Sequence, residues 1–139
     1  MPRRMRRRTF LLAAAASGLS LAWRSTGSWP FLEERLTGSE RLAVLLEGES
    51  ARAVGREYLR AFPAEASSRV LTARVAERLP GGSPVLATAS DGRLRELLLD
   101  ATSADFGELR TVELRGWVLA RTEARLCALA ALRRGSPPA

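Results

Sequence analysis

The spacing of apolar residues is the feature that most constrains the fold of this chain. Between Ser50 and Phe62, apolar positions recur at intervals of three and four residues, which places them on one face of an α-helix. These positions are Ala51, Val54, Gly55, Tyr58, Leu59 and Phe62. We expect Pro63 to end the helix, because the residue before a proline disfavours helical backbone. The pattern predicts a domain assembled from amphipathic helices.

Further helices are predicted on both sides of this segment. Thr37 and Glu40 fit a capping box for a short preceding helix. A third helix is expected over residues 64–79, and the Pro-Gly-rich run 80–84 is expected to be a long loop. The inward-facing residues of these two helices are expected to be Leu42, Leu45, Leu46, Val70, Leu71, Val75 and Leu79.

The sequence of the C-terminal half predicts two more helices and one extended segment. Ser90 or Asp91 can cap a fourth helix, and a last helix is expected over residues 122–134. Between them, residues 110–115 alternate apolar and polar side chains, as in a short strand, and Gly116 is expected to turn the chain. The inward residues of these helices are expected to be Leu94, Leu97, Leu98, Leu126, Leu129, Ala130 and Leu132. The predicted fold class is mainly α: a small domain of about four to five helices, with one short extended segment before the last.

The first 22 residues have the layout of an export signal. Basic residues precede an uncharged run of 15 residues from Thr9 to Trp23, and Ser20-Leu21-Ala22 supplies small residues for cleavage after Ala22. As a helix the run is roughly 22 Å long. Since the hydrocarbon core of a membrane is roughly 30 Å thick, a removable signal is favoured over a membrane anchor.

Within this segment, Arg7-Arg8-Thr9-Phe10-Leu11 resembles the twin-arginine translocation motif, which has two arginines, any residue and then Phe-Leu. The resemblance covers only the signal, and Leu12 stands where that motif often has Lys. It implies recognition by the twin-arginine translocase and export of an already folded protein. An arginine-rich signal of the general secretory route is the alternative.

The net positive charge of the chain lies mainly in this leader. Five of the 22 basic residues, all arginines, fall within the first eight positions; without them, 17 basic residues face 15 acidic ones, a net charge of +2. A nucleic-acid-binding surface needs clustered cations, whereas here Arg alternates with Glu and Asp. We therefore expect no nucleic-acid partner, and membrane contact only through the signal.

The residue types exclude most catalytic chemistry. The chain has no histidine and one cysteine, Cys127, so it has no internal disulfide, no Ser-His or Cys-His pair and no zinc- or haem-ligating motif. No phosphate-binding glycine loop is present either. We predict no metal, no cofactor and no catalytic residue. A small enzyme using carboxylates, Tyr58 or Cys127 is the alternative.

The most distinctive stretch is Gly116-Trp117-Val118-Leu119-Ala120-Arg121-Thr122-Glu123-Ala124-Arg125-Leu126-Cys127-Ala128-Leu129. It resembles a C-terminal signature of small, uncharacterised bacterial proteins with twin-arginine signals. In that family the position of Ala120 is often Ser, which would form a capping box with Glu123. In this chain that cap is lost, and Thr122 is expected to replace it. The resemblance implies kinship and no particular activity.

Two interpretations of this stretch stay open. In one, these residues form a partner or ligand site: Trp117 is the aromatic anchor, Arg121 and Arg125, one helical turn apart, bind a carboxylate bidentately, and Glu123 is a further contact residue. In the other, Trp117 is a core residue, the two arginines form surface ion pairs and Cys127 is a small buried apolar residue.

The predicted organisation is a signal over residues 1–22, a linker over 23–38, a helical domain over 39–134 and a disordered tail over 135–139. We expect an exported or periplasmic protein, membrane-tethered if the signal is not cleaved. Its expected function is that of a small non-catalytic accessory or binding protein, for example a small subunit of a larger exported oxidoreductase.

Overall fold

The computed structural model describes residues 38–46 and 48–133 of this chain. Its elements, in order, are α2 (Gly38–Val44), α3 (Glu49–Ala61), the 3₁₀ turn η1 (Pro63–Glu65), α4 (Ser68–Ala76), α5 (Ser83–Thr88), α6 (Asp91–Gly107), β1 (Thr111–Leu114), β2 (Trp117–Ala120) and α7 (Arg121–Leu132). The mainly helical fold class is confirmed. No helix among the described residues has the length and apolar character needed to cross a membrane.

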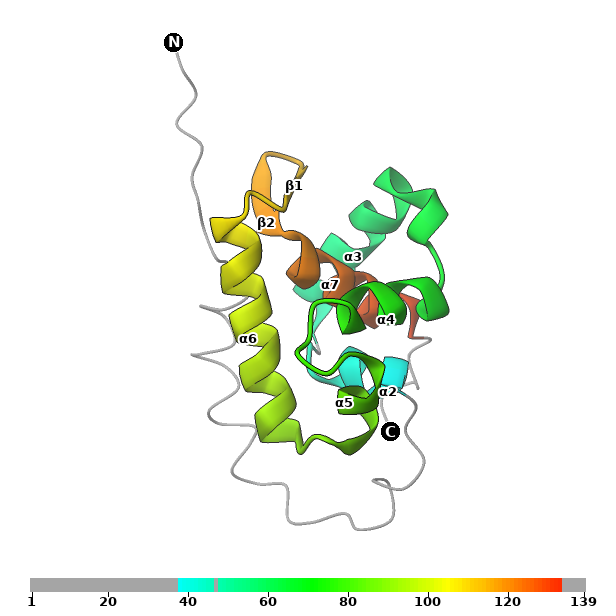
Figure 1. Ribbon diagram of the computed structural model, residues 1–139. Coiled ribbons are helices and arrows are strands. Elements are labelled where there is room, and N and C mark those ends of the chain that lie inside the picture. Colours follow the sequence, from blue (N-terminus) through cyan, green and yellow to red (C-terminus); the bar gives the residue numbers. More distant parts are fainter. Residues whose placement is uncertain (1–37, 47, 134–139) are drawn as a thin grey trace.

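The last helix, α7, is the centre of the domain. It contacts α2, α3, α4, α6 and both strands (Figure 1). All nine residues from Thr122 to Ala130 are buried. Because neighbours surround α7, its sequence is rich in alanine rather than divided into an apolar and a polar face. Its predicted inward residues Leu126, Leu129 and Ala130 are buried, whereas Leu132 is only partly buried.

The helix α3 packs closely along α7 at Gly55. A Cβ atom at this position would lie 2.0 Å from the carbonyl oxygen of Cys127 and 2.8 Å from the Cβ of Ala131. Ala51 and Tyr58, one turn away on either side, are buried on the same face. The predicted amphipathic face of α3 is therefore confirmed, and Gly55 belongs to it because only a hydrogen atom fits there.

The third helix and the loop after it differ from the predicted ones. The third helix, α4, begins at Ser68 rather than at residue 64, because Pro63 starts a separate 3₁₀ turn and Ser67 caps α4 by accepting a hydrogen bond from Val70 N (3.2 Å). The predicted loop 80–84 is shorter than expected, since α5 starts at Ser83. Proline is compatible with the first turn of a helix, so Pro84 does not prevent it. Ser90 caps α6, as predicted.

The predicted extended segment is β1, and it is not isolated. It pairs with β2 in an antiparallel hairpin in which Leu114 lies opposite Trp117 and Val112 opposite Leu119. The two residues of the turn, Arg115 and Gly116, both have positive φ, at 51° and 81°. Two-residue hairpin turns of this kind match the twist of the strands. Residues 117–120 therefore form a second strand instead of leading directly into the last helix.

Candidate functional site

The four predicted contact residues differ in their exposure. Trp117 lies on the hairpin with 38% of its surface exposed. Glu123 and Arg125 are buried in α7, at 3% and 7% exposure, and Arg121 is partly buried. The export residues Arg7, Arg8, Phe10 and Leu11, and the predicted cleavage position after Ala22, lie outside the described residues.

Arg125 holds a carboxylate of its own chain. Its guanidinium donates two hydrogen bonds, to both carboxylate oxygens of Glu65 in η1, at 2.8 and 2.9 Å. The Tyr58 hydroxyl donates a third, at 2.6 Å. The hydrogen bond from Arg125, together with that from Tyr58, lowers the pKa of Glu65 to about 2. Burial, and then the hydrogen bond to Glu65, raises the pKa of Tyr58. This cluster fixes η1 on the central helix.

Arg121 lies beside the same cluster. Its guanidinium carbon is 5.1 Å from the centre of the Phe62 ring, a cation–π distance, and the Phe62 ring is 4.6 Å from that of Tyr58. The predicted pair of arginines therefore does not form an open clamp for an external carboxylate. Arg125 is paired internally and Arg121 packs on an aromatic ring.

The N-terminus of α7 is capped by a residue from another helix. Its N-cap, Ala120, has no capping side chain, and the buried Thr122 hydroxyl makes no hydrogen bond within the described residues. The prediction that Thr122 caps this helix is therefore wrong. Asp105 of α6, 1% exposed, accepts a hydrogen bond from Thr122 N at 2.7 Å. Arg78 and Arg110 lie 3.2 and 3.4 Å from its other oxygen. A carboxylate stabilises a helix N-terminus, and the two arginines balance its charge.

Cys127 lies against the backbone of α3 and is fully buried. Burial, and then the charge of Glu123, raises the pKa of its thiol well above the ordinary value. The thiolate, which is the reactive form of cysteine, is thus strongly disfavoured. Among the described residues, no group of three or more carboxylate or thiol side chains is placed to hold a metal ion. These observations favour the interpretation of Cys127 as a small buried apolar residue.

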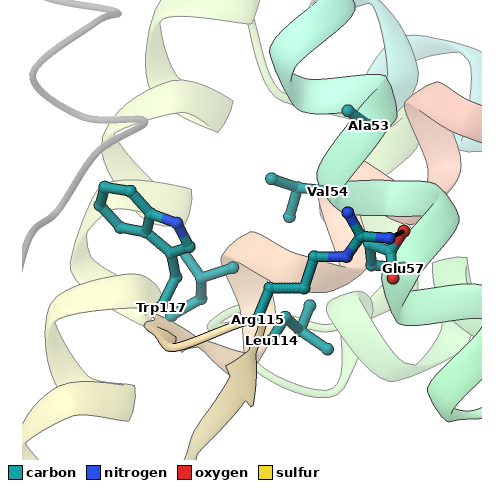
Figure 2. Close-up of a pocket in the computed structure, with 7 residues that line it drawn as sticks. Ala53, Val54, Glu57, Leu114, Arg115 and Trp117 are labelled. Atoms are coloured by element: carbon teal, nitrogen blue, oxygen red, sulfur yellow. Dashed lines mark ion pairs between the residues drawn. The ribbon is translucent and has the colours of Figure 1, made fainter.

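The hairpin and α3 together form an open apolar pocket of about 230 Å³. It is lined by Ala53, Val54, Glu57, Leu114, Arg115, Trp117 and Leu119. Figure 2 shows the Arg115 side chain extending from the hairpin to Glu57, with the Trp117 ring on the other side of the pocket. A buried apolar cavity of about 150 Å³ is enough to bind benzene, so this pocket has room for an aromatic ring.

Charged side chains gather at one edge of the pocket. The Glu57 carboxylate lies 2.8 Å from the Arg115 guanidinium and 2.6 Å from that of Arg60. The Glu57 carboxylate thus pairs with both arginines, and the three side chains together carry a net charge of +1. Both arginine side chains are largely exposed, at 74% and 68%.

The sequence pointed to one residue of this pocket, Trp117. Val54 was expected in the core, whereas it is half-buried and lines the pocket. Glu57 and Arg115 were not singled out, because no local spacing relates residues on α3 to a hairpin turn far along the chain. The signal that could have found them is the Arg115-Gly116 pair, read as a two-residue turn.

These features define a class of protein: a small helical domain with a buried central helix and an apolar pocket under a hairpin. Comparison with family models, curated proteins and solved structures finds no match to this chain.

Proposed function

We propose that this chain is an exported, non-catalytic accessory protein that binds a larger exported protein through the pocket beside Trp117. The observation that carries the proposal is a partly exposed tryptophan at the edge of an apolar pocket. Protein interfaces concentrate their binding energy in such aromatic anchors beside pockets. The buried Asp105 and Arg125 and the partly buried Glu65 form hydrogen bonds within the domain, which supports a structural role for them.

The export part of the proposal rests on the leader sequence. Arg7-Arg8-Thr9-Phe10-Leu11 resembles the twin-arginine motif, and the translocase would be the first partner of the chain. The same resemblance, with that of the C-terminal stretch, supports the proposal that the chain is related to small bacterial twin-arginine-signal proteins. A chain exported by this route would cross the membrane folded, alone or attached to its partner.

The binding step is tested by co-purification of the tagged protein from the periplasm. We expect a larger protein to be recovered in fixed proportion, and Trp117→Ala to abolish its recovery. Leu99→Ala is the matched control, since Leu99 is 40% exposed on α6 and does not line the pocket. Recovery of the wild-type protein as a lone monomer, or equal losses in both variants, would contradict the proposal.

The export step has its own test. Replacing both Arg7 and Arg8 by Lys should prevent periplasmic accumulation, because the translocase receptor recognises the paired arginines. Replacing Arg3 and Arg4 by Lys changes the same segment outside the motif and should leave export unaffected. Unchanged accumulation of the Arg7/Arg8 variant would refute dependence on this route.

A further inference from the structure

The pocket has a place for an aromatic side chain that the described residues do not fill. Its wall is formed by Val54, Leu114 and Leu119, and its volume of about 230 Å³ exceeds what a benzene-sized ring requires. Trp117 borders it with 38% of its surface exposed. Covering this apolar surface would be favourable, because it removes apolar area from water.

The edge of the pocket also indicates the charge of its occupant. Because Glu57 is shared by Arg60 and Arg115, the edge carries net positive charge beside the apolar wall. An occupant with complementary chemistry has a bulky apolar part followed closely by carboxylates. Such complementarity selects among apolar segments more than it adds affinity.

One segment of the chain itself has this chemistry. Residues 29–34 read Trp-Pro-Phe-Leu-Glu-Glu, three large apolar side chains followed by two carboxylates. They lie outside the described residues, and they remain in the chain whether or not it is cleaved after Ala22.

The length of the intervening chain allows contact with the pocket. Trp29 is nine residues before Gly38, where α2 begins, and nine extended residues span roughly 30 Å. The helix α2 has seven residues, about 10 Å, and Leu46 just beyond it packs against the cluster of Ala51 and Cys127, as does Val54. Val54 lines the pocket, so the path is short. Tethering gives the segment an effective concentration in the millimolar range, above that of a free partner.

We propose that residues 29–34 bind the pocket in cis, with an aromatic ring in the apolar space and Glu33 and Glu34 facing Arg60 and Arg115. The proposal rests on the proposed function, since the segment then covers the surface that a partner uses. A partner must displace it, and the partner's own docking segment should have the same order of apolar and acidic residues.

The test is intramolecular cross-linking in the full chain. Pro30→Cys is combined with Ala53→Cys at the exposed edge of the pocket, and treated with a short bismaleimide; the native Cys127 is buried and does not compete. The matched control combines Pro30→Cys with Leu109→Cys, 81% exposed and not part of the pocket. We expect cross-linked monomer to form about tenfold faster in the first pair, because docking raises the effective concentration of the two thiols.

Charge reversal tests the second part of the proposal. Glu33→Arg with Glu34→Arg, in the first cysteine pair, should slow cross-linking toward the rate of the control, and adding Arg60→Glu with Arg115→Glu should restore it. Equal rates in the two cysteine pairs, or cross-linked dimers in place of monomers, would overturn cis docking. Neither result affects the co-purification that depends on Trp117, so failure of this inference and failure of the proposed function are distinguishable.

Discussion

Replacing Gly55 by alanine would put a methyl group where the structure has the backbone of α7. The added Cβ would lie 2.0 Å from the carbonyl oxygen of Cys127, and 2.8 Å from the Cβ of Ala131. Ordinary van der Waals contact begins at about 3.4 Å, so the two helices would have to separate by more than 1 Å. A backbone carbonyl cannot rotate away as a flexible side chain can.

The expected cost follows from two opposing effects. Overpacking a core costs roughly 1–3 kcal/mol, and a clash with helix backbone belongs at the upper end. Alanine is favoured over glycine within a helix by up to about 1 kcal/mol, which offsets part of this. We expect the free energy of unfolding to fall by about 2 kcal/mol. For a domain of this size, that lowers the melting temperature by roughly 10 °C.

Urea unfolding followed by far-UV circular dichroism measures the change. Gly92→Ala is the matched control, because Gly92 also lies in a helix and its added Cβ would meet no atom within 4 Å. This control should be as stable as the wild type, or more stable by up to about 1 kcal/mol. A Gly55→Ala protein as stable as the wild type would refute the close approach of α3 and α7.

Three further predictions concern Asp105, Glu65 and Cys127. Asp105→Asn should lower the free energy of unfolding by about 3 kcal/mol in urea titrations, because it removes the buried carboxylate charge that pairs with Arg78 and Arg110 and caps α7. Glu108→Gln, at the exposed end of the same network, should cost less than about 1 kcal/mol. Glu65 has a pKa of about 2 in the folded protein, below its ordinary value near 4.5, so its contribution to stability is present above pH 4.5 and is lost as the pH falls toward 2. In urea titrations across this range, the free energy of unfolding of Glu65→Gln should therefore decline less steeply than that of the wild type. Cys127 should react with a maleimide only after denaturation, and modification of the native protein at a comparable rate would contradict its burial.

The helices that could be predicted from the sequence are those with one face exposed. In α3, apolar residues alternate with charged ones at helical spacing, because the opposite face of the helix is exposed to water. The central helix α7 has no such alternation, so its bounds were nearly right but its burial on all sides was not anticipated. The short helix α5 was missed because Pro84 reads as a loop signal and also fits the first turn of a helix.

The polar contacts could not be predicted, because they join residues far apart in the chain. Arg125 and Glu65 are sixty positions apart, and no local pattern relates them. The capping of α7 is similar: its N-cap position holds alanine, and the carboxylate comes from α6, seventeen residues earlier than Thr122. Sequence reasoning about capping considers neighbouring positions, whereas here tertiary packing supplies the cap.

These contacts divide the C-terminal stretch into a structural part and a surface part. Arg125 is paired with Glu65, and the start of α7 is capped by Asp105, so changes at either site should destabilise the domain rather than alter the pocket. Trp117 precedes α7 on the hairpin and has a partly exposed side chain. The turn at Arg115 and Gly116 places it across from Leu114, at the edge of the pocket. Stability and binding therefore rest on different residues of one continuous segment, which allows mutagenesis to separate them.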